Sequence, residues 1–525
     1  MSGRRKKVAS GGPIVIHQPS PYPEAEAGAG WRPPVRVTAR AAKIYHGDAE
    51  LRAPIDTGVE TKPARRAAAV DALRGLFLLS MTLGFTIQPE IFPVWMYHRQ
   101  FPPPGHAFVD VAGISWRDVT YGAFLFSMAA AVPITLALRI ARGATEFGII
   151  GAALKRAFML FVFALLIGHS NSYFIGEYTQ RSRLIGVIGF LLTFLVFTRA
   201  RKDWNRDRFE TLQRWGWGAV VAFLALSPLI YDRMFSIYRR DDIISALAFA
   251  ALTGWIIWYF TRRNIPARLA VLAVVVALFI GAQKAGPVQD FWYGSPLPFL
   301  FNNSSLVLLC VVIPGTIAGD LILRWMQTAV EAPAERGFGR LRAGMLLVLA
   351  LSATPILVVG IYHRQTLGTA LALAAVSAGA IALSWSARTP TERLVRDTFA
   401  WSAAWIMLGM LLEPMGGGMR KVPDNLSYYF AIAGVSMMLL NAATLITEIF
   451  GSGRSVRFLT DVGQNPMLCY ILYSVFLNSL LEMVPGLRDF MRGSQGASIV
   501  RSFAMVLIVG LITREFTRRR IFWRA

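Results

Sequence analysis

From Ala67 onward, long apolar stretches alternate with short polar ones along the chain. The apolar windows run for about 17 to 22 residues, and a helix of that length crosses about 30 Å of hydrocarbon. Because only helices and closed barrels satisfy their backbone polar groups in lipid, these windows predict transmembrane helices. We expect about 14 of them, with a range of about 11 to 14, because the stretches at 184–199 and 398–414 are short. The predicted fold is an all-α, polytopic integral membrane helical bundle.

Composition supports this class and divides the chain into three parts. The 525 residues are 54% hydrophobic and 16% charged, and the mean hydropathy is +0.47; a soluble domain has about 25% charged residues. Residues 1–66 contain scattered charge, Gly and Pro without apolar periodicity, which predicts a disordered cytosolic arm. Residues 67–513 are predicted to form the transmembrane domain, and residues 514–525 a basic cytosolic tail. The arm has no cleavable secretory signal, so the first span is expected to act as an uncleaved signal.

The net charge of +23 is distributed unevenly between alternate loops. With the N-terminus placed in the cytosol, the helix ends and loops on the cytosolic side carry 22 Lys and Arg, whereas the opposite loops carry about 13. This asymmetry predicts that both termini are cytosolic. The basic charge is therefore interpreted as orientation and contact with anionic membrane lipids, and no nucleic-acid partner is predicted.

The chain lacks the short motifs of common metal and nucleotide sites. Its two cysteines, Cys310 and Cys469, lie in apolar stretches far apart in the sequence, which favours packing roles over a disulfide framework or a zinc site. No Walker loop, GxSxG elbow or HExxH sequence is present. No metal site and no permanently bound cofactor are predicted.

Four of the six histidines, His98, His106, His169 and His363, fall on the predicted extracytoplasmic side. A histidine at the mouth of a span is often a solvated loop residue or an interfacial anchor. Four on one side, with none in the predicted cytosolic loops of the transmembrane domain, favour a proton-handling site there, because imidazole titrates near neutral pH.

Polar residues also interrupt two apolar helices near the predicted cytosolic side. Asp71 and Arg74 lie three residues apart at the start of the first span, where they either form an intrahelical ion pair or present Arg74 to an anion. Gln464 and Asn465 precede a late span that begins at Pro466. Asn465 either caps that helix, or it joins Gln464 in binding a cytosolic ligand.

Several stretches occur in the order found in one family of membrane enzymes. They are VDALRG at 70–75, His106–Ala107, Gly113, Asp118, Phe124 and Phe126, AVPITLALR at 131–139, RLIGVIGFLL at 183–192, VPDNLSYYFAIAG at 422–434 and VGQNPMLCYILYS at 462–474. Together they resemble the bacterial and lysosomal membrane acyltransferases related to heparan-α-glucosaminide N-acetyltransferase. The resemblance touches both ends of the membrane domain, and residues from about 200 to 400 carry little of it.

The resemblance implies a bacterial inner-membrane enzyme. It would move an acyl group, expected to be acetyl, from cytosolic acyl-CoA to an extracytoplasmic glycan or lipid-linked acceptor. The family's catalytic histidine corresponds to His106, with His98 as a competitor and His169 as a reserve; it would act as a general base or as an acylated relay. Asp118 either orients His106 or only caps the helix that follows it.

Acyl-CoA is the expected donor substrate at the cytosolic side, where arginine and lysine would meet its phosphates. The residues predicted to bind it are Asp71, Arg74, Lys155, Arg156, Gln464 and Asn465. Two other classes stay open: a secondary transporter or flippase of a lipid-linked or small anionic substrate, and a non-catalytic membrane scaffold. A homodimer is possible.

Overall fold

The computed structural model confirms the all-α prediction. It describes residues 67–524 apart from short gaps at 88–90, 177, 202, 227–233, 296, 298–299, 301, 329–336, 485 and 487–493. Within these residues there is no β-strand, only one isolated antiparallel bridge between Thr198 and Trp523. The predicted arm, residues 1–66, lies outside the described residues.

Eleven helical segments of the described chain are long and apolar enough to cross a membrane. They are α1 (Ala68–Thr86), α2 (Trp116–Ala141), α3 (Glu146–Ser170), α5 (Gln180–Phe197), α8 (Asp242–Thr261), Asn303–Met326 including α11 (Leu309–Met326), α12 (Arg340–Tyr362), α13 (Thr366–Ser384), Leu426–Ile449 including α15 (Leu426–Thr444), Pro466–Met483 including α17 (Pro466–Ile471) and α18 (Asn478–Met483), and α20 (Gln495–Arg518). The polytopic helical bundle is thus observed.

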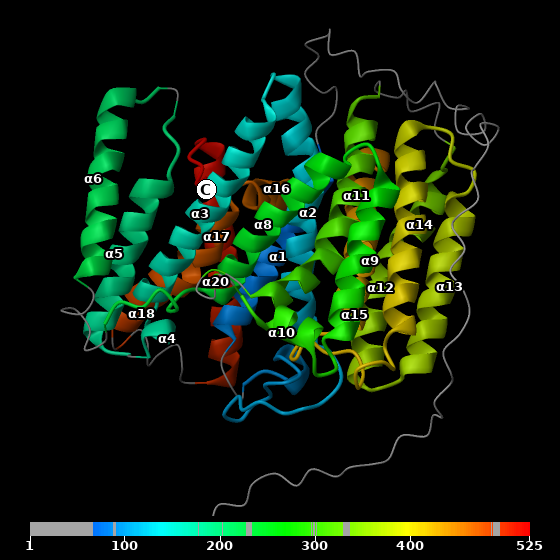
Figure 1. Cartoon of the computed structure of the whole chain (residues 1–525), viewed down its shortest axis with the longest axis horizontal. Helices are drawn as coiled ribbons and strands as arrows, with labels where there is room; N and C mark the ends of the chain where they lie inside the picture. The colour runs from blue at the N-terminus through cyan, green and yellow to red at the C-terminus, as the bar shows by residue number, and fades with distance from the viewer. Residues whose placement is uncertain are drawn as a thin grey trace, which may run out of the picture. The chain divides into compact units, whose positions relative to one another are not determined.

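Three further helices, α6 (Arg206–Ala225), α9 (Ile265–Gly281) and α14 (Pro390–Leu411), run alongside these segments (Figure 1). α9 is an apolar helix of only 17 residues, and α6 and α14 are less apolar. The eleven segments alone give the lower limit of the predicted range of 11 to 14, and the eleven together with these three helices give the upper limit. The helix expected at 398–414 begins earlier, because Thr389 and Glu392 form a capping box ahead of the apolar stretch.

The long helices end at two opposite faces of the bundle. We call the end where α1 and α3 begin and α20 finishes the C-terminal face, and the end that carries residues 91–115 the loop face (Figure 1). The short α16 (Arg457–Gly463) lies at the C-terminal face, and α4 (Ser172–Ile175) and α10 (Pro287–Tyr293) lie at the loop face. The predicted cytosolic loops map to the C-terminal face.

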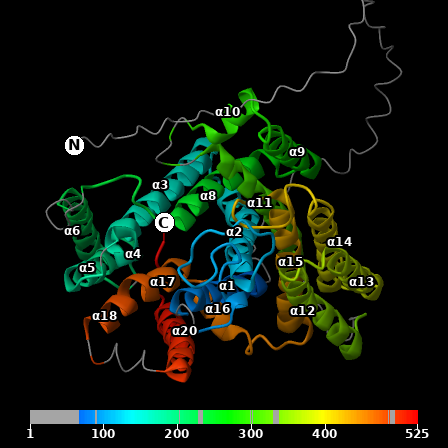
Figure 2. The ribbon, with the colours of Figure 1, turned by 90° about the horizontal axis from the view of Figure 1, so that it is seen from below.

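Burial separates central helices from peripheral ones. The segments containing α11 and α15 are 83% and 78% buried, whereas α12 and α13 are only 28% and 22% buried and lie at the edge of the bundle (Figure 2). α1 and α16 touch through glycines: a Cβ added at Gly463 would lie 1.9 Å from the carbonyl oxygen of Asp71, and one at Gly75 would lie 2.0 Å from that of Leu459. The VDALRG and VGQNP stretches therefore meet in space, because glycine allows their backbones to approach.

Candidate functional site

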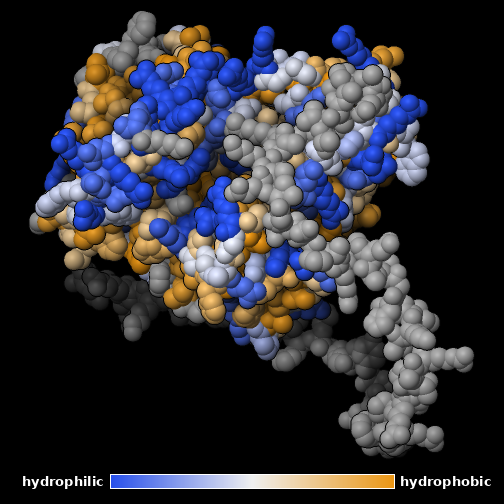
Figure 3. Space-filling model, turned by 90° about the horizontal axis from the view of Figure 1, so that it is seen from above, coloured by the Kyte–Doolittle hydropathy of each residue, from blue (hydrophilic) through white to orange (hydrophobic). Residues whose placement is uncertain are grey.

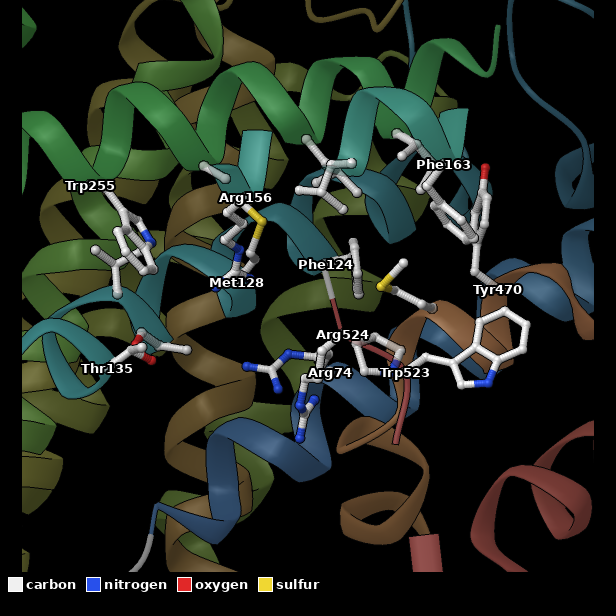
Figure 4. A pocket seen from close by; sticks show the side chains of 18 of the residues that line it. Arg74, Phe124, Met128, Thr135, Arg156, Phe163, Trp255, Tyr470, Trp523 and Arg524 are labelled. Atoms are coloured by element: carbon white, nitrogen blue, oxygen red, sulfur yellow. The ribbon is translucent and has the colours of Figure 1, made fainter. Parts of the chain in front are cut away.

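A cavity of about 540 Å³ lies between α1, α2, α3, α8, α17 and the residues after α20. Figure 4 shows Arg74 beside Arg524 on one part of its wall, and Phe163 and Tyr470 on another. Seen from above, the C-terminal face of the bundle is rich in hydrophilic side chains (Figure 3). Much of the cavity wall itself is apolar, formed by Phe124, Met128, Val132, Leu160, Phe163, Ile244, Leu247 and Met467.

The polar part of this wall is dominated by positive charge. Five arginines line the cavity, and no carboxylate among the described residues does; the five are Arg74, Arg139, Arg156, Arg199 and Arg524. Arg74 pairs with Asp71 outside the cavity, with Nη1 3.2 Å from Oδ1. Burial, followed by the charges of Arg74 and Arg199, lowers the pKa of Arg524. Because like charges gather here with little compensation, the cavity favours an anionic ligand.

Two of these arginines are held by one aromatic ring. The Cζ atoms of Arg139 and Arg156 lie 5.4 and 5.5 Å from the ring centroid of Trp255, which is itself buried. Such cation–π contacts fix the direction of a guanidinium group without neutralising its charge. Both charges therefore remain available to a ligand.

The segment 521–524, which follows α20, contributes two residues, Trp523 and Arg524, to the cavity wall. Asn465 holds this segment at two points: its Nδ2 donates to the carbonyl oxygen of Ile521 at 2.9 Å, and its Oδ1 accepts from the backbone N–H of Trp523 at 3.1 Å. Trp523 is 1% exposed and lines the cavity together with Arg524. The segment thus brings a cation from the far end of the sequence into the site.

The predicted donor-site residues divide into those on the cavity wall and those beside it. Arg74 and Arg156 line the cavity. Asp71 forms the ion pair with Arg74 that the spacing predicted. Lys155 is exposed and does not line the cavity, because it points about 100° around α3 from Arg156.

Gln464 and Asn465 do not line the cavity either, so their direct contact with a ligand stays a prediction. The Asn465 side chain clamps residues 521–524 and does not cap α17. The side chain of Gln464 donates to the carbonyl oxygen of Thr460 at 3.1 Å. The backbone carbonyl oxygen of Gln464 accepts from the Arg524 side chain at 3.1 Å. Both residues support the site through the segment that carries Arg524.

At the loop face, Asp118 and His98 form a close contact. Asp118 lies in the first turn of α2, where its Oδ2 accepts from the backbone N–H and the hydroxyl of Ser115 at 2.8 and 3.0 Å. Its Oδ1 lies 2.5 Å from His98 Nδ1. The Asp118 side chain is fully buried, whereas that of His98 is 28% exposed. The capping box therefore fixes a carboxylate that orients the imidazole, and Nε2 of His98 is left for a ligand.

Cationic and phenolic groups surround this pair. Lys421 Nζ, from the segment between α14 and α15, lies 5.6 Å from the ring centroid of Tyr121, and the Tyr428 hydroxyl donates to the carbonyl oxygen of Asp118 at 2.7 Å. Burial of the ring, followed by the charge of Lys421, lowers the pKa of His98 to about 4, against the opposing effect of Asp118. His98 is neutral at pH 7 and able to accept a proton.

His106 does not take part in this pair. Its Nδ1 bonds to the carbonyl oxygen of Phe101 at 2.9 Å, its ring lies 5.6 Å from that of Tyr97, and its backbone is left-handed with φ of 50°. Asp118 orients His98 instead, so the prediction that it orients His106 is wrong, whereas its predicted capping role is observed.

The closure of the loop that contains His106 explains why Asp118 contacts His98 and not His106. The side-chain amide of Gln100 donates to the carbonyl oxygens of Val111 and Gly113 at 3.0 and 2.9 Å. These bonds close residues 101–112 into a separate loop that contains His106. His98, which precedes this loop, therefore reaches Asp118 in the first turn of α2, whereas His106 within the loop does not.

The remaining histidines also lie outside the pair. His169 is buried in α3, where its Nδ1 bonds to the carbonyl oxygen of Leu165 at 2.9 Å and its ring stacks on Phe235 at 5.0 Å. These contacts tie His169 to its own helix and to the segment before α8, and none of them reaches His98. His363 is an exposed residue at the end of α12.

α2 connects the two sites. Phe124, Met128, Thr135 and Arg139 line the cavity, and at about 100° per residue they fall within an arc of about 60°. Asp118 lies six residues before Phe124, which is about 9 Å along the helix axis. The helix that carries the carboxylate of the loop-face pair is therefore also a wall of the arginine cavity.

Sequence comparison adds one similarity. The family described as a domain of unknown function (DUF5009) matches residues 66–322, which is 257 of the 525 residues. The matched part contains His98, Asp118 and four of the five cavity arginines, and it stops before Lys421, Asn465 and Arg524. No curated protein matches the chain. The similarity carries no activity with it.

Proposed function

We propose that this protein is a membrane acyltransferase related to the heparan-α-glucosaminide N-acetyltransferase group. It takes an acyl group, expected to be acetyl, from acyl-CoA in the arginine cavity and passes it to a glycan or lipid-linked acceptor at the loop face. The observation that carries the proposal is the placement of five arginines and the His98–Asp118 pair along one helix, α2, and its neighbours. In a bacterial inner membrane, the C-terminal face would be cytosolic.

The cavity suits acyl-CoA in both its polar and its apolar parts. Phosphate groups are bound well by arginine, whose planar guanidinium donates two parallel hydrogen bonds. The acyl-bearing arm of the donor carries no charge, and the wall formed by Phe124, Leu160 and Met467 can bury it. A ligand with several phosphates would also relieve the repulsion among the cavity arginines.

The loop-face pair supplies the base that acyl transfer requires. Neutral Nε2 of His98 takes the proton of the acceptor amine or hydroxyl while that nitrogen or oxygen attacks the thioester carbonyl carbon. The new C–N or C–O bond forms, the C–S bond breaks, and the leaving thiolate of CoA receives the proton from the imidazolium. Asp118 holds the Nδ1–H tautomer and stabilises the imidazolium between the two steps.

The test is thioester cleavage by the purified full chain in detergent, with acetyl-CoA as donor and a soluble hexosamine as acceptor. His98→Ala should lower the rate of acyl transfer by about 10²-fold or more, because a positioned base is lost. The rate should persist at pH 6, because burial, Lys421 and Arg117 lower the pKa of His98 to about 4 despite Asp118, and the base is lost only as pH falls through that value.

His106→Ala is the matched control, and it should retain the wild-type rate. Full activity of His98→Ala, or a rate that halves near pH 6.5 as for an unperturbed imidazole, would contradict the role of His98. A transporter of small anions would use the same arginines without consuming a thioester. Anion flux in liposomes without any release of CoA would therefore favour that second class.

A further inference from the structure

Along α2, fewer than two helical turns separate the first cavity-lining residue from Asp118 of the His98–Asp118 pair. The cavity lining on α2 begins at Phe124, and Asp118 lies six residues earlier. Tyr121 is midway between them. At about 100° per residue, Tyr121 points in the same direction as Arg139 and within the arc of the cavity-lining residues, with Asp118 about 60° to one side. A group passing from the cavity to the pair would pass Tyr121.

The Tyr121 hydroxyl is buried and makes no hydrogen bond with the described residues. The residue is 9% exposed. Three neighbouring phenols are already used: Tyr428 donates to the Asp118 carbonyl oxygen at 2.7 Å, Tyr429 to Asp424 at 2.5 Å, and Tyr470 to Asp241 at 3.1 Å. A buried hydroxyl without a partner is costly, so a site that retains one points to a partner that comes from outside the protein.

Positive charge lies next to this unused donor. Lys421 Nζ is 5.6 Å from the ring centroid of Tyr121. Asp424 and Asp241 are close enough to interact electrostatically with the phenol, but both carboxylates already accept hydrogen bonds from other tyrosines. A neutral donor beside an ammonium group is the arrangement that stabilises an oxygen atom on which negative charge develops.

We propose that Tyr121 donates a hydrogen bond to the carbonyl oxygen of the thioester and stabilises it as an oxyanion during acyl transfer. This inference rests on the proposed function. When the acceptor adds to the carbonyl carbon, the C=O π electrons move to oxygen, and Tyr121 binds that oxygen without giving up its proton. When the oxyanion collapses, the C=O bond re-forms and the thiolate of CoA leaves. Lys421 adds positive charge nearby.

The test is Tyr121→Phe in the full chain, which removes only the hydroxyl. Because the hydroxyl has no partner among the described residues, the thermal midpoint should stay at the wild-type value or rise. The turnover number for transfer from acetyl-CoA should fall by about 10²-fold or more, the usual effect of losing one oxyanion donor. The dissociation constant for CoA, which has no acyl carbonyl, should stay within about twofold. Tyr293→Phe removes an exposed phenol of α10 and should change none of these values.

The possible results separate this inference from the proposed function. If His98→Ala abolishes transfer while Tyr121→Phe keeps the wild-type turnover, the role of Tyr121 is overturned and the acyltransferase stands. A loss of CoA affinity as large as the loss of turnover would make Tyr121 a binding residue, and it would also overturn the inference. A variant that does not fold would show that the hydroxyl has a partner in the protein. A wild-type protein that cleaves no thioester overturns both proposals.

Discussion

Arg268 and the five cavity arginines, all in the half of the bundle nearer the C-terminal face, hold positive charge in opposite ways. Arg268 of α9 is fully buried, and its Nη1 lies 2.7 Å from Asp320 Oδ2. Its other donors reach the hydroxyls of Thr261 and Thr316 at 3.0 and 3.2 Å. Among the ion pairs of the described residues, only one, with Asp71, involves any of the five arginines of the cavity.

This difference separates charge that holds helices together from charge that is available to a ligand. Asp320 also accepts from Trp258 Nε1 at 2.7 Å, so a complete polar cluster joins α8, α9 and α11. Four of the cavity arginines are instead positioned by Trp255, for Arg139 and Arg156, or by backbone carbonyl oxygens, for Arg74 and Arg524. Removing one member of a buried ion pair lowers the stability of the protein, whereas removing one of several like charges reduces their mutual repulsion.

The largest expected effect is therefore on stability. Arg268→Ala should lower the free energy of unfolding by about 3 to 5 kcal/mol, because it leaves the buried Asp320 without its cation. Arg156→Met, which removes one cavity charge and keeps most of the side-chain volume, should leave the stability unchanged or raise it. Thermal denaturation of both variants in the same detergent measures the contrast.

A double variant tests the cause of that loss. Arg268→Met together with Asp320→Asn removes both charges and keeps an acceptor for Trp258, so it should recover most of the lost stability. If Arg156→Met were as destabilising as Arg268→Ala, the distinction between Arg268 and the cavity arginines would fail.

The second expected effect is on ligand affinity, which should depend on the cavity arginines and not on Arg268. Arg156→Met should weaken the binding of CoA, and of pyrophosphate as a probe for the phosphates alone, by about 10-fold or more, since hydrogen bonds to charged groups contribute about 1.5 to 3 kcal/mol each. Arg156→Lys keeps the charge without the bidentate geometry, so its affinity should lie between those of the wild type and Arg156→Met. Equilibrium binding at two ionic strengths measures the effect, because screening by salt should reduce it.

Arg206 provides the matched control for this measurement. Its side chain is 84% exposed on α6 and pairs with Glu210, so Arg206→Met should leave the affinity for pyrophosphate unchanged. An equal loss in Arg156→Met and Arg206→Met would indicate a general effect of net charge, and the cavity would not be the site.

The fold was predictable because the membrane imposes it on the sequence. Apolar windows of span length can satisfy their backbone only as helices, so the all-α bundle follows from the pattern of apolar positions. The length of α14 was not apparent, because its first turn is a polar capping box at 389–392. The charges of Arg74 and Arg156 also indicated residues that line the cavity, since a charge near a span end faces either solvent or a polar cavity.

The partners within the site depend on contacts that the sequence does not display. His98 and His106 lie on the same predicted loop. The Gln100 side chain closes residues 101–112 into a separate loop that contains His106, so that His98 is the one that reaches Asp118. From the sequence, Arg524 is one of several basic residues of the tail. It lies on the cavity wall because hydrogen bonds from Asn465 hold residues 521–524 there. Tyr121 was indistinguishable from an ordinary interfacial tyrosine, because an absent hydrogen bond has no sequence signature.

The smallest expected effect concerns the segment that carries Arg524. Asn465→Ala removes the two hydrogen bonds that hold residues 521–524, each contributing about 1 kcal/mol. The segment should therefore open more often, and hydrogen exchange at Trp523 should become faster. Affinity for pyrophosphate should fall by less than in Arg156→Met, because Arg524 is displaced only part of the time. Adding pyrophosphate should slow the exchange again, since a ligand that binds the closed state favours it.

Gln464→Ala is the control that makes this last contrast sharp. Among the described residues, its side chain bonds only to the carbonyl oxygen of Thr460. The carbonyl oxygen that accepts from Arg524 belongs to the backbone and survives the substitution. Exchange at Trp523 should therefore stay at the wild-type rate. If exchange in Asn465→Ala also stayed unchanged, the segment would be held by its own packing. If exchange rose while pyrophosphate affinity did not fall, Arg524 would belong with Arg268, as charge that supports the fold and not the ligand.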